Sequence, residues 1–298
     1  MPTGRDGAIV RSMPDGIEVR ALRDPRLFAQ LSSRWLATDP FSTNVMGVQL
    51  DGVLRGVRPQ GEEDIWIVAV KRGRVLGAAM HTPPYHLFLP RLPSGVASQI
   101  ANTLAAAGRP VSGVIGETNT VAELVSVWAE RTGSKSSSLM KMRMYRLKEL
   151  THPVATSGVA RQGGPDERHL LIEWFERFDA EVASDRPGEE AAIAVERRLA
   201  AGELWLWWDG GRSVSVAGHS AAAAGVARVG PAYTPPEYRC QGYGTAVTAS
   251  ATHAALHAGA EHVALYTDLA NPVSNSIYQT IGYVADHDAE DTRLIPNS

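Results

Sequence analysis

The sequence has almost no cysteine, no long apolar run and no surplus of one charge, and each absence excludes a class of protein. A single cysteine among 298 residues cannot form an internal disulfide, which argues against a disulfide-stapled secreted domain. No apolar stretch reaches the roughly 18 residues that a membrane-spanning helix needs. The 29 basic and 32 acidic side chains give a net charge of -3, so no basic surplus points to nucleic acid or to an anionic membrane as a partner.

The beginning of the sequence, Met-Pro-Thr-Gly-Arg-Asp-Gly, contains no apolar signal core. Together with the lone cysteine, this predicts a soluble protein of the cytoplasm. The length and the 44% hydrophobic content are sufficient for two domains of ordinary size, each with its own core.

A polar segment divides the chain near its middle. Residues 151–165 are rich in Thr, Ser, Gly and Pro, and they separate two stretches of patterned sequence. We therefore predict one domain over residues 1–150 and a second over residues 151–298.

The second half alternates helical and extended patterns. Apolar residues at helical spacing predict a helix over 166–183 and another over 189–201. An Asp-Gly-Gly turn between two β-rich runs predicts a hairpin of residues 204–208 and 213–217. A further strand is expected over 225–234, and its Gly230-Pro231 pair predicts a bulge or a free edge because proline cannot donate to a ladder.

The most informative segment follows that strand. Residues 233–244 are Tyr-Thr-Pro-Pro-Glu-Tyr-Arg-Cys-Gln-Gly-Tyr-Gly, and an Ala/Thr-rich helical stretch begins directly after them. Gly242 and Gly244 allow positive φ or close backbone approach, so several N–H groups can converge at the positive end of the helix dipole. Arg239 can add a charged fork to the same anion. The loop therefore predicts a seat for a pyrophosphate, although an ordinary strand-to-helix turn has the same outline.

A dinucleotide-binding loop is the competing interpretation, and the details exclude it. That fingerprint requires Gly-x-Gly-x-x-Gly, and Val247 stands at the third glycine position. The fingerprint also requires an acidic residue after the next strand, whereas Glu261 precedes it.

A second motif lies about 30 residues downstream. The β-rich run 263–267 is followed by Asn271-Pro272, an N-cap and N1 pair that starts a helix well. The string from there is Asn-Pro-x-Ser-x-x-Ile-Tyr-x-x-x-Gly-Tyr, which ends at Tyr283.

The two motifs, in this order, resemble the phosphate loop and the closing helix of the GNAT acyltransferase superfamily. The resemblance implies an α/β (α+β) fold in which a mixed, mostly antiparallel twisted sheet is flanked by helices, with a splayed strand pair that binds acyl-CoA. It also implies acetyl-CoA as co-substrate, no metal, and an N-acetyltransferase whose acceptor is a primary amine of a small molecule or protein. By the resemblance, the coenzyme contacts are Ala232, Tyr233, Thr234, Arg239, Cys240, Gln241, Gly242, Tyr243, Gly244, Thr245, Asn271 and Ser274. A pantetheine arm would pair with the backbone of the first three like an added strand.

Tyr278 matches the family's tyrosine near the coenzyme sulfur. The resemblance implies that it is the general acid that protonates the departing thiolate. The alternative is a half-buried helix tyrosine with its hydroxyl at the surface.

The first half repeats this plan in a weaker form. A helix over 25–37 and a hairpin of 65–70 and 75–80 are expected, but the loop position has Arg91-Leu-Pro-Ser-Gly-Val, and Trp128 stands where the tyrosine would be. We predict a degenerate GNAT-like domain that forms a wall of the acceptor site or stabilises the second domain.

The general base and the acceptor are less defined. No carboxylate lies in 225–234. His219, expected on the hairpin turn, is a candidate base or else a surface turn residue. Acidic residues are concentrated between 166 and 190, where an acidic rim including Asp179 would attract a cationic amine, although a solvated helix face explains them as well. The missing base leaves a second function open, namely a non-catalytic acyl-CoA-binding or sensing module.

Overall fold

The computed structural model describes residues 9–12, 16–153, 156–182 and 190–297. The chain divides into two compact units, of which the second is Met142–His287 and the first contains the residues before it together with those from Asp288 onward. The boundary at residue 150 stays a prediction about domains; the second compact unit begins a few residues earlier, at Met142.

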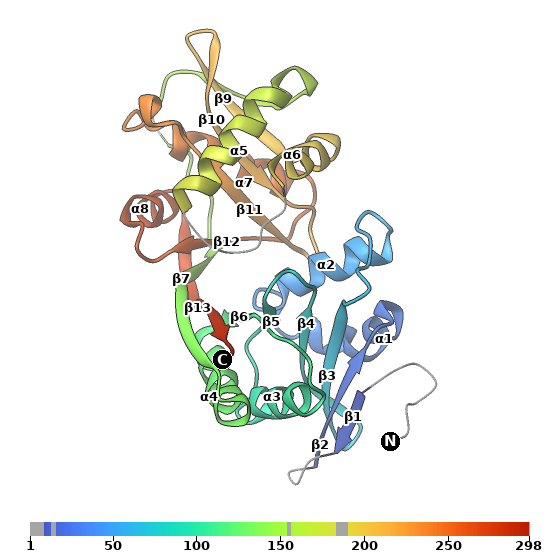
Figure 1. Cartoon of the computed structure of the whole chain (residues 1–298). Helices are drawn as coiled ribbons and strands as arrows, with labels where there is room; N and C mark the ends of the chain where they lie inside the picture. Colours follow the sequence, from blue (N-terminus) through green and yellow to red (C-terminus); the bar gives the residue numbers. More distant parts are fainter. Residues whose placement is uncertain (1–8, 13–15, 154–155, 183–189, 298) are drawn as a thin grey trace. The chain divides into compact units, whose positions relative to one another are not determined.

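The first unit is a sheet with helices on both faces (Figure 1). Its elements are β1 Ile9–Ser12, β2 Ile17–Leu22, α1 Pro25–Leu36, α2 Asn44–Leu54, β3 Ile65–Lys71, β4 Arg74–His81, β5 Leu87–Leu89, α3 Val96–Ala106, β6 Gly113–Glu117 and α4 Thr118–Thr132. The strands follow the order β1-β2-β3-β4-β5-β6, with antiparallel neighbours except for the parallel pair β5–β6. One core lies under α1 and α2 around Phe28 and Met46, and another under α3 and α4 around Ile100 and Leu124.

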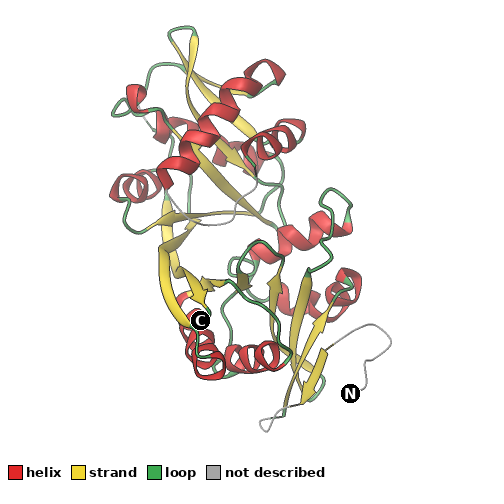
Figure 2. Ribbon diagram, in the orientation of Figure 1, coloured by secondary structure: helices red, strands yellow, loops and turns green. Residues whose placement is uncertain are grey.

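The second unit repeats this arrangement (Figure 2). Its elements are β8 Val159–Gln162, α5 Arg168–Val182, α6 Ala191–Ala200, β9 Leu204–Asp209, β10 Arg212–His219, β11 Val226–Tyr233, α7 Tyr243–His257, β12 His262–Asp268 and α8 Pro272–Thr280. Helices α5 and α6 pack on one face around Trp174 and Val195, and α7 packs on the other around Val247 and Ala251. The hairpin and the helices predicted for this half are confirmed, although residues 183 and 189, where two of them were expected to end or begin, lie outside the described residues.

Two long strands connect the units. Strand β7, Lys135–Leu147, begins in the first unit, and its last residues, Met142–Arg146, pair with β12 of the second. Strand β13, Tyr283–Ile295, begins in the second unit, and residues from Ala289 onward pair with β6 of the first. The sheet of the second unit therefore contains the end of β7, which starts in the first unit. The sheet of the first unit contains the end of β13, which starts in the second.

The predicted fold class is confirmed, since each unit is a mixed, mostly antiparallel sheet between helices. Across the described ranges, no helix combines the length and the apolar character that a membrane crossing requires.

Candidate functional site

The N-terminus of α7 is a cluster of backbone N–H groups. Gly242 is the N-cap with a left-handed φ of 81°, Cys240 has a φ of 62°, and no side chain caps the helix. The first bond inside the helix runs from Ala246 N to Gly242 O at 3.0 Å. In the described part of the chain, the N–H groups of residues 240–245 therefore have no acceptor, which leaves them available to an anion at the positive end of the helix dipole.

Gly244 keeps this loop close to its neighbours. A Cβ at this position would lie 3.1 Å from Thr234 Oγ1 and 3.7 Å from Ile277 Cδ1. A larger side chain would push the loop away from the end of β11 and from α8. The two glycines thus have different functions, because Gly242 supplies the left-handed backbone and Gly244 supplies the close approach.

Strand β11 separates from β12 where the predicted coenzyme contacts begin. The two strands pair in parallel only from Val226 to Arg228, while β11 continues to Tyr233. On its other side β11 pairs with β10 again at Ala232 and Tyr233, after a register shift at the Gly230-Pro231 pair. The predicted bulge and free edge are both confirmed. An open strand edge of this kind can accept an extended chain such as a pantetheine arm.

The bulge also changes the face that each side chain occupies. Before it, Ala227 and Val229 point toward the core under α7 and α8. After it, Ala232 faces α7, whereas Tyr233 packs with Trp174 under α5. The interval of three residues between Val229 and Ala232 shows that the strand alternation has been shifted by one residue.

Arg239 is engaged within the protein. Its guanidinium makes two bonds to the Glu181 carboxylate on α5, at 2.7 and 2.6 Å, and its Nε donates to Thr234 O at 2.9 Å. Tyr233 Oη donates to the same carboxylate, and burial followed by Glu181 raises the pKa of Tyr233. Both partners of the Arg239–Glu181 pair are 44% exposed, so the pair adds little to stability and can rearrange when an anion arrives.

Other predicted contacts have defined places. The Tyr243 side chain is buried and donates to Asp209, the last residue of β9, which lowers the pKa of that carboxyl. Cys240 and Gln241 are exposed at the loop, and Thr245 lies half-buried in the first turn of α7.

Tyr278 lies on α8 in a group of aromatic rings. Asn271 caps this helix, as predicted, by accepting from Ser274 N at 3.0 Å. The Tyr278 ring lies 6.4 Å from Tyr145 and 6.3 Å from Tyr283. Burial raises the pKa of Tyr278 to about 12, against the effect of a hydrogen bond with Ser274, so the phenol holds its proton at neutral pH.

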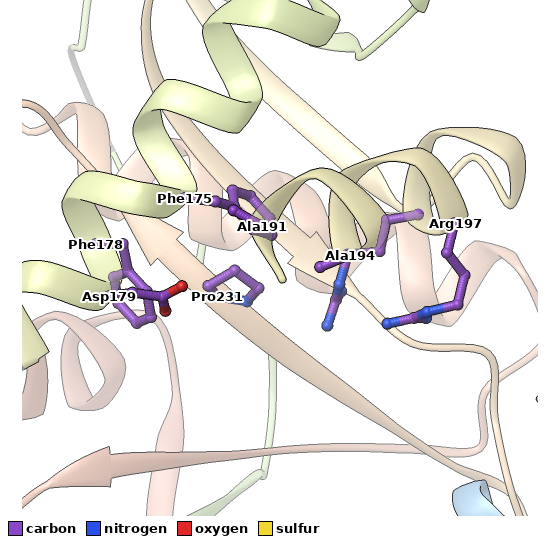
Figure 3. Close-up of a pocket in the computed structure, with 8 residues that line it drawn as sticks. Phe175, Phe178, Asp179, Ala191, Ala194, Arg197 and Pro231 are labelled. Carbon is purple, nitrogen blue, oxygen red and sulfur yellow. The ribbon is translucent and has the colours of Figure 1, made fainter. Parts of the chain in front are cut away.

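The place predicted for His219 needs correction, and Asp179 has a more specific place than the sequence indicated. His219 is the last residue of β10 and is buried, so it is not exposed on a turn. Its backbone N donates to Glu203 O, which continues the pairing up to this residue. Asp179, named above as part of an acidic rim, lines a pocket together with Pro231 of β11 (Figure 3). The sequence gives no signal that this side chain, rather than Glu173 or Glu176, reaches the strand.

The first unit has a counterpart of the α7 seat, and its own side chains fill it. Gly95 is the left-handed N-cap of α3, with a φ of 87°. The Glu123 carboxylate of α4 accepts from Gly95 N at 3.0 and 3.1 Å, from Ser98 N at 2.8 Å and from Ser98 Oγ at 2.9 Å.

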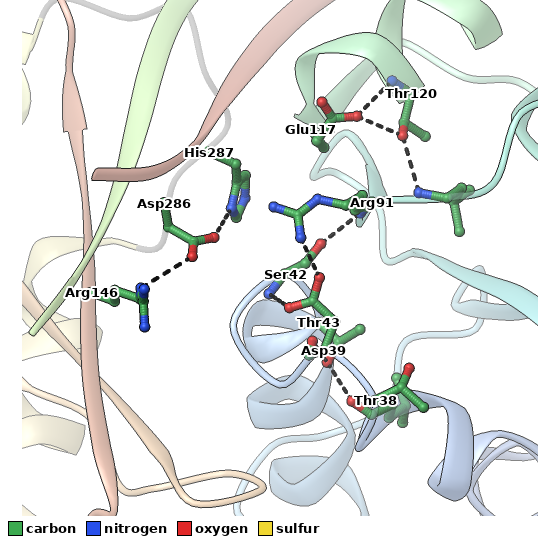
Figure 4. Close-up of polar contacts among 12 residues, drawn as sticks. Thr38, Asp39, Ser42, Thr43, Arg91, Glu117, Thr120, Arg146, Asp286 and His287 are labelled. Carbon is green, nitrogen blue, oxygen red and sulfur yellow. Dashed lines mark hydrogen bonds and ion pairs between the residues drawn. The ribbon is translucent and has the colours of Figure 1, made fainter. Parts of the chain in front are cut away.

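The rest of that loop is closed in the same way. Arg91 N donates to Ser42 Oγ at 2.6 Å, and Arg91 pairs with Asp39 at 2.8 Å (Figure 4). Leu92 N donates to Thr120 Oγ1 at 3.2 Å. Trp128, at the position of the tyrosine, is buried in the core of this unit.

Comparison with known proteins agrees with this geometry. The acetyltransferase (GNAT) family model matches residues 168–283, which contain the α7 seat, the free edge of β11 and Tyr278. None of the curated proteins compared with the chain matches it.

Several solved structures share the fold over nearly the whole chain. A GCN5-related N-acetyltransferase from Sphaerobacter thermophilus has a TM-score of 0.66 at 15% identity and covers 96% of this chain and 98% of its own. An acetyltransferase of the GNAT family from Colwellia psychrerythraea has a TM-score of 0.56 at 12% identity, with 94% and 99% covered. A tandem GNAT protein from the clavulanic acid biosynthesis pathway has a TM-score of 0.54 at 13% identity, with 94% and 98% covered. These likenesses extend over both units, so the fold is that of two GNAT-like domains, and residues 168–283 of the second unit match the GNAT acetyltransferase family.

Proposed function

We propose that the protein is an acetyl-CoA-dependent N-acetyltransferase that transfers an acetyl group to a primary amine by direct attack. The observation that carries the proposal is the juxtaposition of unpartnered N–H groups at residues 240–245 with the free edge of β11. A diphosphate and an extended amide-bearing arm are the two features of coenzyme A that these backbone groups fit.

The residues present fit the coenzyme. The N–H groups of 240–245 would hold the diphosphate, and the backbone of Ala232, Tyr233 and Thr234 would hold the arm. Arg239 would join the diphosphate if it exchanged Glu181 for the ligand. Acetyl-CoA supplies an activated acyl thioester, and the rest of the chemistry belongs to the protein.

In the reaction, the C–N bond forms as the thioester C–S bond breaks. The amine loses a proton to a base or to solvent, and the thiolate gains one. Tyr278 is protonated at neutral pH and lies on α8, whose Ile277 borders the phosphate loop at Gly244. We assign it the role of the acid, and the rate contribution of a positioned acid is typically about 10²-fold or more.

The substitution Tyr278→Phe tests this role. It removes only the hydroxyl, so turnover is expected to fall by about 10²-fold while acetyl-CoA affinity stays nearly constant. Steady-state thiol release and calorimetric titration measure the two quantities. Tyr145→Phe is the matched control, because it removes a hydroxyl from the same ring cluster. An unchanged kcat in Tyr278→Phe would remove this residue from the mechanism.

A panel of primary amines tests the activity itself. Release of free thiol in the presence of at least one amine, with a stoichiometric amide product, is the expected outcome. Tight CoA binding without release for any amine would favour instead a non-catalytic acyl-CoA-binding module on the same fold.

A further inference from the structure

A pocket of about 190 Å³ lies between α5, α6 and the bulge of β11, entirely within the second unit. Phe175 and Phe178 form its aromatic wall, and Pro231 forms the side toward the sheet (Figure 3). A volume of this size is below the roughly 300 Å³ at which pockets for drug-sized ligands begin, so the space admits a small molecule.

One end of the pocket is acidic. The Asp179 carboxylate lies beside Phe178 and Pro231, on the α5 side (Figure 3). It makes no hydrogen bond or ion pair with any residue in the described ranges, and partial burial raises its pKa. A carboxylate in this state is satisfied by an ammonium group that enters from solvent.

The other end is basic. Arg197 and Arg198 follow each other on α6, and both line the pocket beyond Ala194. Arg198 is only 15% exposed, and its Nη1 lies 4.0 Å from the Glu203 carboxylate, with which an anionic ligand would share it. Gly218 makes room for this guanidinium, since a Cβ there would lie 3.0 Å from Arg198 Nη1. Two guanidinium groups at one end of a small pocket present the donor geometry that carboxylates and phosphates prefer.

The pocket also borders the predicted coenzyme path. Pro231 immediately precedes Ala232, at the point where β11 has already left β12. An amine held at the Asp179 end would therefore lie in the pocket that Pro231 lines, one residue before the segment that would hold the pantetheine arm.

We propose that this pocket selects the acceptor, and that the acceptor is a small amine which also carries an anionic group, either a carboxylate or a phosphate. The ammonium group binds at Asp179, and the anionic group binds at Arg197 and Arg198. The inference rests on the proposed acetyltransferase function and makes it more specific. A diamine would bring its second ammonium group to the arginine end, where like charges repel.

Binding to the CoA-saturated protein tests the inference separately from turnover. Calorimetry compares matched pairs: alanine with ethylamine and lysine with cadaverine for the carboxylate, and glucosamine 6-phosphate with glucosamine for the phosphate. We expect the anionic member of at least one pair to bind at least 10-fold more tightly than its partner. Equal or tighter binding of the partner that lacks the anionic group in every pair, or use of a peptide amine with no binding of any anionic amine, would overturn the inference.

The variant Arg197→Gln assigns the preference to this pocket. Arg197 is exposed on α6, so its loss should not unfold the protein. The tight member of the pair is expected to lose at least 10-fold in affinity, while the weak member is unaffected. Arg168→Gln, which removes a surface arginine paired with Glu196 outside the pocket, is the control. An unchanged ratio in Arg197→Gln would contradict the proposal.

The two proposals fail in different ways. Selective, Arg197-dependent binding without thiol release would reject the acetyltransferase and keep the pocket assignment. Thiol release with amines that lack an anionic group, at equal efficiency, would keep the acetyltransferase and reject the pocket assignment.

Discussion

In both units a helix follows a left-handed glycine at the corresponding point of the fold. The backbone N–H groups at the start of that helix have an acceptor in the first unit and none among the described residues in the second. At α3, the carboxylate of Glu123 accepts from the N–H groups of Gly95 and Ser98. At α7, the N–H groups of residues 240–245 have no acceptor among the residues that the structure describes. The first unit therefore supplies its own anion, whereas no described side chain fills the corresponding position of the second.

The strands that precede these helices also differ: the one in the first unit is fully paired with its parallel neighbour, and the one in the second unit is paired only in part. All three residues of β5 pair with β6, and Gly116 lets the strands approach so closely that a Cβ would lie 1.8 Å from Leu89 O. In the second unit β11 has eight residues, of which only Val226–Arg228 pair with β12. Among the described residues of the first unit, the start of α3 is therefore filled and β5 has no unpaired stretch beside β6. The second unit thus differs from the first in a longer strand and a helix start without a described side-chain cap, and these two backbone features carry the proposed coenzyme site.

The most severe test of the comparison is to separate the units. A fragment of residues 151–298 lacks β7, whose Met142–Arg146 segment pairs with β12, and whose Tyr145 is 1% exposed in the core. We expect it to lose cooperative unfolding and CoA binding, because β12 loses its antiparallel pairing strand and a core residue is missing. Circular dichroism melting and CoA titration against the full chain measure this. A folded fragment with full affinity would show that neither β7 nor the first unit is necessary.

The two N-cap glycines offer a matched pair of substitutions. Gly242→Ala and Gly95→Ala both place a Cβ on a left-handed residue, at a cost of about 1–2 kcal/mol in stability. CoA affinity is expected to fall at least 10-fold in Gly242→Ala, where the loop must also move from Thr156, and to stay unchanged in Gly95→Ala. Equal losses of affinity in both variants would mean that the first unit also binds the coenzyme.

A substitution of Glu123 tests whether its carboxylate stabilises the start of α3. Glu123→Ala leaves the N–H groups of Gly95 and Ser98 without their acceptor, so the free energy of unfolding is expected to fall by about 2 kcal/mol. The closed β5–β6 pair should still exclude the coenzyme. We expect one CoA per chain in both proteins by calorimetry, and a stoichiometry of two in the unmodified protein would refute the closed state of the first unit.

Acid should affect the first unit through His81. Burial, with smaller contributions from the charges of Arg109 and His86, lowers the pKa of His81 to about 4. Since the unfolded residue titrates near 6.5, the neutral folded form is favoured above that pH, and the contribution is lost as the pH falls toward 4. Between pH 7 and pH 5 the loss is about 2 kcal/mol.

Denaturant unfolding at both pH values measures this effect, with His81→Gln as the variant that cannot gain the charge. The difference between the two proteins isolates the histidine from the carboxylates that titrate in the same range. An identical pH dependence in both would exclude His81 as its source.

Much of the second unit could be predicted because its signals are local. Proline and glycine fix the bulge at Gly230-Pro231, and Asn271-Pro272 caps α8 as expected. The Glu181 carboxylate at Arg239 and the reach of Asp179 to Pro231 could not be predicted, since each joins residues more than 50 positions apart. The roles of the predicted coenzyme contacts stay predictions.

The sequence by itself determined where the backbone is accessible. Glycines, prolines and capping residues set strand ends and helix starts through local sterics, and they revealed the loop, the closing helix and the resemblance to the GNAT superfamily. Only the tertiary structure decided which of the two helix ends stays open, because that depends on a carboxylate, Glu123, brought to α3 from another helix. The tertiary structure also decided that β7 pairs with β12 and that β13 pairs with β6, although the partners lie far apart in the sequence. Turn and cap preferences depend on a few neighbouring residues. Whether a backbone N–H group finds a hydrogen-bond acceptor depends instead on which distant residues the fold places next to it.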